Sequence, residues 1–143
     1  MRLSDDVCFL NTPHALLRAL SRLEDSNIKL QFIGNTCPEL KQEIQQLNLG
    51  NKVILKPYMP HIASIAELQQ SDLLLLVINQ VANGKGIVPG KIFEYLGTRK
   101  PILCLGDPTG EAGEIIKTTN SGFCIAHHNE EEIFILLSRL SSG

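Results

Sequence analysis

Residues 73–78 read Leu-Leu-Leu-Leu-Val-Ile, an unbroken apolar run that directly follows Ser71 and Asp72. A strand with one face in solvent alternates apolar and polar residues, whereas a strand covered on both faces is apolar throughout. Parallel sheets provide that cover, because their crossover helices lie on both faces. The run therefore predicts a buried strand inside a parallel sheet.

Segments with helical and strand periodicity alternate on both sides of this run. The expected helices span 16–23, 40–47, 62–70, 91–96, 110–119 and 133–140, and the expected strands 30–33, 53–55, 101–105 and 123–126. Thr12-Pro13 is typical of an N-cap followed by proline at the first helical position. This alternation, with short connections, predicts one α/β domain over residues 1–143, a doubly wound parallel sheet.

The first strand is the ambiguous element of this pattern. Val7–Leu10 is a short apolar stretch preceded by the polar residues Ser4, Asp5 and Asp6. Either this stretch is the first strand, or the first strand lies upstream of Met1 and is truncated. The first strand is usually central in a six-stranded doubly wound sheet, so its loss would expose an edge.

Composition excludes several functions. Charged residues make up 20% of the chain, the formal net charge is −2, and no block of basic residues occurs, so binding to nucleic acid is not indicated. No apolar run is long enough to cross a bilayer, and the N-terminus lacks a signal-peptide pattern. We therefore expect a cytoplasmic domain that associates with membranes only through a part absent from this sequence, peripherally at the inner face.

The four cysteines are not spaced as zinc ligands. Cys8, Cys37, Cys104 and Cys124 are all far apart in the chain, whereas zinc sites use closely spaced pairs. Three of them have apolar neighbours, which favours small buried side chains in a reducing compartment. We expect no metal site and no cofactor.

The loop after residues 73–78 is the candidate binding site. Gly84, Gly86 and Gly90 would let the backbone approach a ligand closely, and the helix that begins near Gly90 would direct its N–H groups at an anion. Lys85 and Lys91 could add positive charge. The spacing matches neither a Walker motif nor the dinucleotide-binding fingerprint, and a plain flexible loop explains the glycines equally well.

Glu94 lies about one turn into the same helix. An acidic residue there is favoured by the helix dipole alone, by some tenths of a kcal/mol. A carboxylate in that place could also accept hydrogen bonds from the paired hydroxyls of a ribose. The spacing by itself favours the purely structural interpretation.

The stretch Gly90-Lys91-Ile92-Phe93-Glu94-Tyr95-Leu96-Gly97, followed by residues 100–103, resembles the signature of the retaining GT-B glycosyltransferases, group 1 (family 4). The resemblance covers roughly residues 13–140 and matches their C-terminal, Rossmann-like domain. It implies that the chain binds a nucleoside-diphosphate sugar for transfer to an acceptor held by an N-terminal domain absent here, as in bacterial polysaccharide biosynthesis. The isolated domain would be inactive, and its catalytic residues are not identified.

The resemblance also implies roles for single residues. Glu94 would hold the ribose, and the segment with Gly84, Lys85, Gly86, Gly90 and Lys91 would face the diphosphate and the sugar, without an obligatory metal. The sequence departs from the family pattern at two places. A second glutamate that contacts the sugar is replaced by Gly86, and the usual basic pair after the first strand is not recognisable between Met1 and Pro13.

Two other classes of protein share parts of this pattern. A nucleotide-sugar epimerase of the same GT-B architecture would differ mainly in its upstream half. A flavodoxin-like or receiver-like regulatory domain is disfavoured, because a receiver needs an aspartate after its third strand and Lys56-Pro57 follows residues 53–55 here.

Several polar residues call for no function. His127 and His128 follow a strand end and are expected to be solvated, and Arg99-Lys100 is expected to form an exposed turn. Glu130–Glu132 are expected in the first turn of the last helix, where negative charge is stabilising.

Overall fold

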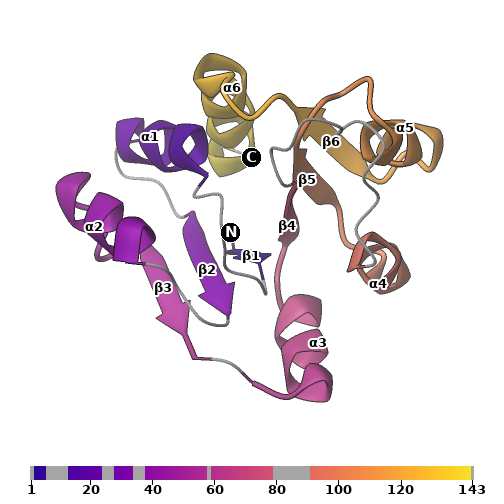
Figure 1. Cartoon of the computed structure of the whole chain (residues 1–143), viewed down its shortest axis with the longest axis horizontal. Helices are drawn as coiled ribbons and strands as arrows, with labels where there is room; N and C mark the ends of the chain where they lie inside the picture. The colour runs from indigo at the N-terminus through magenta and orange to yellow at the C-terminus, as the bar shows by residue number, and fades with distance from the viewer. Residues whose placement is uncertain are drawn as a thin grey trace.

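The computed structural model describes residues 2–5, 13–23, 28–33, 38–57, 59–78 and 91–142. These residues form one six-stranded parallel sheet with helices on both faces (Figure 1). The strands are β1 (Arg2–Asp5), β2 (Lys29–Ile33), β3 (Val53–Lys56), β4 (Leu73–Val77), β5 (Ile102–Leu105) and β6 (Gly122–Ile125). The helices are α1 (His14–Arg22), α2 (Pro38–Gln46), α3 (His61–Gln69), α4 (Lys91–Thr98), α5 (Glu111–Thr118) and α6 (Glu130–Ser142).

The strand order is β3-β2-β1-β4-β5-β6, and every pair of neighbours is parallel. This is the order of the six-stranded dinucleotide-binding fold, and it differs from the flavodoxin-like order. The predicted doubly wound sheet is confirmed, and the flavodoxin-like alternative is wrong. The order reverses between β1 and β4, so the connections that follow these two strands leave in opposite directions.

The first strand is present at the centre of the sheet, and both expectations about its position were wrong. β1 comprises Arg2–Asp5, and its Ser4 is in register with Gln31 of β2 and Leu74 of β4. Residues 7–10 lie outside the described part of the chain. A strand paired on both sides is held by backbone hydrogen bonds, which do not depend on side-chain polarity, so polar residues at its end could not exclude it.

Each face of the sheet has its own apolar core. Leu73 and Leu75 of β4 pack into a cluster with α1, α2 and α6, whereas Leu74 and Leu76 pack into a cluster with α3, α4 and α5. These four leucines are at most 1% exposed. The run at 73–78 is therefore apolar for the predicted reason, because successive side chains enter two different cores.

Helix boundaries agree with the predicted segments to within a few residues, with one difference at α1. Pro13 is the N-cap residue of α1 and the helix begins at His14, so proline does not occupy the first helical position. Cys104 is buried, as expected, and Cys124 is half-buried. None of the described helices combines the length and the hydropathy needed to cross a membrane.

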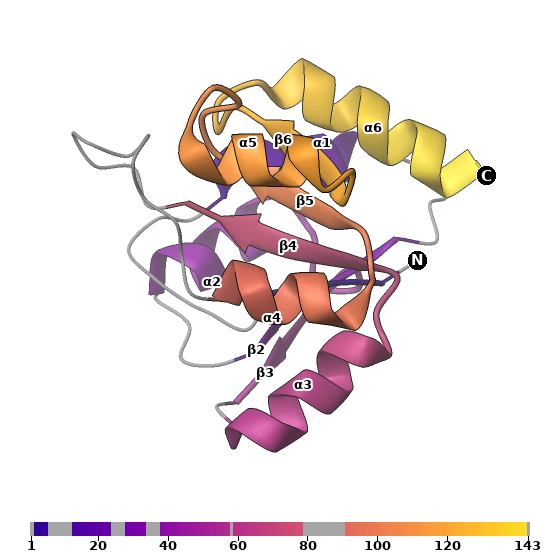
Figure 2. The ribbon, with the colours of Figure 1, turned by 90° about the vertical axis from the view of Figure 1, so that its right-hand side faces the viewer.

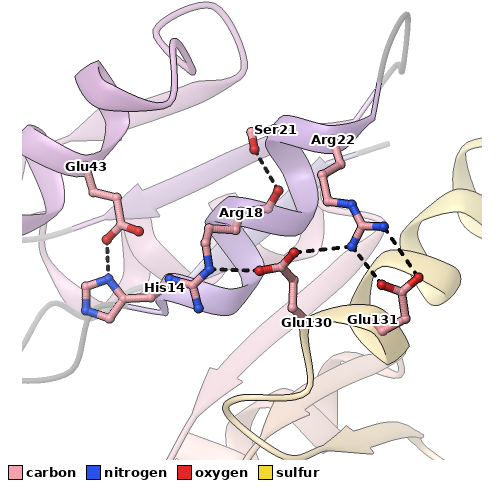
Figure 3. A network of polar contacts seen from close by, with 7 residues as sticks. All are labelled: His14, Arg18, Ser21, Arg22, Glu43, Glu130 and Glu131. Carbon is pink, nitrogen blue, oxygen red and sulfur yellow. Dashed lines mark hydrogen bonds and ion pairs between the residues drawn. The ribbon is translucent and has the colours of Figure 1, made fainter.

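Ion pairs attach the last helix to the first (Figure 3). Arg18 Nε donates to Glu130 Oε1 at 2.8 Å, and Arg22 Nη1 donates to Glu131 Oε2 at 2.9 Å. The Arg22 guanidinium also lies over the ring of Phe134, 4.0 Å from its centroid. The bond to Glu131 raises the pKa of Arg22, and the bond from Arg18 lowers the pKa of Glu130. Glu130–Glu132 lie in the first turn of α6, as predicted, and two of them also pair with α1.

Candidate functional site

The carboxyl edge of the sheet at the β1/β4 switch is where open parallel sheets bind ligands. β4 runs toward this edge and α4 runs back from it, so α4 begins there (Figure 2). The connection from β4 to α4 contains the predicted ligand-binding glycines and Lys85. Gly84, Lys85, Gly86 and Gly90 lie outside the described residues, and Lys91 is the first residue of α4. β4 and α4 therefore lead into and out of the predicted segment, and the ligand contacts of its glycines and lysines stay predictions.

Glu94 occupies the first turn of α4 and is exposed. Ile92 and Tyr95, on either side of it, are fully buried at 0% exposure in the core beneath the helix. Because residues on the opposite side of a helix face away from the core, Glu94 and Phe93 point outward, and Phe93 is 60% exposed. The carboxylate is thus not packed into the interior, and it lies one turn from the start of a helix that begins at the binding edge.

A tight turn between β5 and α5 forms a neighbouring part of this edge. A Cβ added at Gly106 would lie 2.8 Å from Ile78 Cγ1, directly after β4, and one added at Gly113 would lie 2.6 Å from the Pro108 carbonyl oxygen. Asp107 Oδ1 accepts hydrogen bonds from the Thr109 N–H at 2.8 Å and from Thr109 Oγ1 at 2.6 Å. The glycines allow close packing here, and the aspartate fixes the turn.

His127 is a polar residue of this edge whose position the sequence did not reveal. It follows β6, and its side chain is half-buried next to the Ile78 backbone. Burial lowers the pKa of His127, and the charge of His128 lowers it further, against a raising effect of the Ile78 backbone. The expectation that it is solvated was therefore wrong, whereas His128 is exposed as predicted. Its place just after a strand was the available signal, because residues that follow the strands of a parallel sheet lie at the ligand-binding edge.

The His127 and His128 rings do not form a shared binding site. Their centroids are 6.4 Å apart and the ring planes are tilted by 49°. Among the described residues, no group of three or more histidine, cysteine or acidic side chains could hold a metal ion. Both residues lie in the turn between β6 and α6.

A polar cluster attaches α3 to the sheet. Glu67 Oε2 accepts hydrogen bonds from Lys56 Nζ at 3.1 Å and from Gln31 Nε2 at 3.4 Å, and Gln31 is 0% exposed. The glutamate thereby joins α3 to β2 and β3. Lys56 stands at the carboxyl end of β3, but its ammonium group is paired with Glu67. It does not replace the basic pair that the sequence lacks.

Solved structures of similar fold are numerous. HepE of Anabaena, in complex with UDP and glucose, superposes with a TM-score of 0.69 at 19% identity, over 96% of this chain and 38% of HepE. The C-terminal domain of LpcC, a group 1 glycosyl transferase from Francisella tularensis, gives 0.68 at 16% identity, over 99% of this chain and 75% of that one. A Listeria monocytogenes protein assigned as a UDP-N-acetylglucosamine 2-epimerase gives 0.67 at 18% identity, over 99% and 37%.

These likenesses establish the fold as the Rossmann-like domain of GT-B proteins, and this chain spans well under half of HepE. No match is found among curated protein sequences. The sequence profile of the family "Glycosyl transferases group 1" matches residues 11–142. That match includes the α4 signature and nearly every described element, and so the chain belongs to the group 1 glycosyl transferases.

Proposed function

We propose that this chain is the donor-binding domain of a glycosyltransferase that transfers a hexosyl unit from a nucleoside diphosphate with retention of configuration. The observation that carries the proposal is the position of Glu94, outward-facing in the first turn of a helix that starts at the switch-point edge. There its carboxylate accepts hydrogen bonds from the two ribose hydroxyls of the donor.

The diphosphate lies against the segment that contains Gly84, Lys85, Gly86, Gly90 and Lys91. Backbone N–H groups, the positive end of α4 and the two lysines stabilise the charge that develops on the leaving group, and no metal is required. The HepE complex, which contains UDP and glucose, supports a nucleotide sugar as the donor. The acceptor is held by an N-terminal domain that is not part of this sequence.

Transfer is favoured over epimerisation. The fold occurs in both classes, since the Listeria protein superposes about as well as the transferases. The group 1 profile, however, matches residues 11–142, and its name describes transfer. Epimerisation is therefore the less favoured function.

Calorimetric titration with UDP, GDP and their sugars tests donor binding, with Glu94→Gln as the variant. Loss of hydrogen bonds to a charged group costs about 1.5–3 kcal/mol, which corresponds to a roughly tenfold to hundredfold weaker affinity. The matched control is Glu114→Gln, because Glu114 holds the same position in α5 that Glu94 holds in α4, the fourth residue of its helix. Equal affinity of the Glu94 variant and the wild type would remove the ribose role.

A further inference from the structure

A cleft of about 500 Å³ is lined by residues at the amino edge of the sheet. This edge is opposite the one where α4 begins (Figure 2). The cleft is formed where α4 and α5 end and β5 and β6 begin. Its lining includes Arg99, Lys100, Asn120, Ser121, Gly122 and Phe123. This volume falls in the range of small-molecule sites, about 300–1,000 Å³.

The two cations of this cleft are not needed to cap the helices. At the end of α4, the Tyr95 carbonyl accepts from Thr98 Oγ1 at 2.6 Å and the Leu96 carbonyl accepts from the Arg99 N–H at 3.1 Å. At the end of α5, the Ile116 carbonyl accepts from the Ser121 N–H at 3.0 Å. These carbonyl groups at the helix ends are thus satisfied by their own turns.

The charged groups of Arg99 and Lys100 make no ion pair or hydrogen bond with any residue that the structure describes. Like charges on adjacent residues repel each other, and an anion bound between them would relieve this repulsion. The described acidic side chains that form ion pairs lie on α2, α3 and α6 instead. This leaves a positive charge of two at the cleft without a protein partner among the described residues.

The backbone holds the cleft in a defined shape. Arg99 and Asn120 have positive φ angles of 62° and 52°, and Gly122 has a φ of 153°. A Cβ at Gly122 would lie 2.0 Å from the Ile102 carbonyl oxygen, so only glycine allows this approach of β6 to β5. Phe123 follows directly and is 41% exposed, which places an aromatic side chain in the wall beside the cations.

We propose that this cleft binds a phosphate monoester carried on an aromatic or other apolar body. A phosphate dianion matches the two charges of Arg99 and Lys100, and the guanidinium can donate two parallel hydrogen bonds to it. The apolar body of the ligand packs on Phe123. The site is separate from the donor site, because the two lie at opposite edges of the sheet.

Phenyl phosphate is the probe, with inorganic phosphate and phenol as its two halves. In a ¹⁵N-HSQC titration of the 143-residue chain, phenyl phosphate should shift the amide signals of Arg99, Asn120, Ser121 and Gly122 saturably. Each half should bind at least about tenfold more weakly than the whole probe, a loss of 1.4 kcal/mol or more. Shifts confined to other residues, or no saturable shift, would overturn the proposal.

Variants separate this site from a general attraction of anions. Arg99→Gln combined with Lys100→Gln should weaken phenyl phosphate at least about tenfold, whereas Lys117→Gln should not. Lys117 is the matched control, because it is an exposed cation in the last turn of α5 that does not line the cleft. Glu94→Gln should also leave binding unchanged. Equal binding of phenyl phosphate by the double variant and the wild type would overturn the proposal. If the double variant does not fold, Phe123→Ala tests the same site. It should weaken the binding of phenyl phosphate but not of inorganic phosphate, and equal binding of phenyl phosphate by this variant would overturn the proposal.

Discussion

Gly122→Ala should destabilise the domain more than its single methyl group suggests. The substituted residue would keep a φ near 153°, and its Cβ would lie 2.0 Å from the Ile102 carbonyl oxygen and 2.6 Å from the Ile102 nitrogen. These atoms belong to β5, which is paired with β4 on its other side, so they cannot move away. Backbone strain of about 1–3 kcal/mol and a forced displacement of about 1–3 kcal/mol together predict a loss of about 2–6 kcal/mol.

Urea denaturation followed by circular dichroism measures this loss as the change in the free energy of unfolding. Gly97→Ala is the matched control, because Gly97 lies in α4 and a Cβ there would meet nothing within 4 Å. Alanine is favoured over glycine inside a helix, so this variant should gain up to about 1 kcal/mol. A Gly122→Ala protein within about 1 kcal/mol of the wild type would refute the reasoning, because it would mean that β6 can separate from β5 at no cost.

Other variants test the core, the titrating groups and the α1–α6 ion pairs. Leu75→Ala removes a 0%-exposed side chain from β4 and should cost about 2–5 kcal/mol of unfolding free energy, and a loss below 1 kcal/mol would contradict tight packing. The lowered pKa of His127 favours the neutral ring in the folded state, so stability should fall as the pH drops below its ordinary value of 6.5; an NMR titration that gives His127 a pKa above that value would oppose this. Glu130 has a lowered pKa in the folded state, so its ionised carboxylate should stabilise the fold above its ordinary pKa of 4.5. This stabilisation should be lost as the pH falls through the folded-state pKa, and Glu130→Gln should abolish this part of the pH dependence of stability. A double-mutant cycle of Arg22→Gln and Glu131→Gln should give a favourable coupling that 1 M salt removes, and a coupling independent of salt would show that the contact is not ionic.

The buried strands were predictable from the sequence because a strand covered on both faces is apolar at successive positions. Residues 73–78 are apolar at every position, and the structure places alternate side chains of β4 in two cores. The helices α5 and α6 follow from their apolar spacing in the same way. β1 was misplaced, because four residues with polar ones at the end carry too little of this periodic signal, and its pairing depends on partners far along the chain.

The candidate site was less predictable from sequence than the fold. The outward position of Glu94 follows from the buried neighbours Ile92 and Tyr95, which the pattern of α4 contains. The half-buried position of His127 depends instead on its neighbour Ile78, which is distant in sequence. Likewise, the amino-edge cleft requires two helix ends to meet, and no local pattern in residues 99–101 or 120–123 indicates that meeting.

The central location of β1 has a consequence for the order of folding. The pairing of β1 with β2 joins segments that follow one another in the chain, whereas the pairing of β1 with β4 closes the long loop from residue 3 to residue 73. Because the entropy cost of closing a loop rises with its length, β1-β2-β3 and β4-β5-β6 can form early as two partial sheets, and the pairing of β1 with β4 joins them late. Amide protons in β1 should then report the complete assembly, and exchange there should require the cooperative opening of the whole domain.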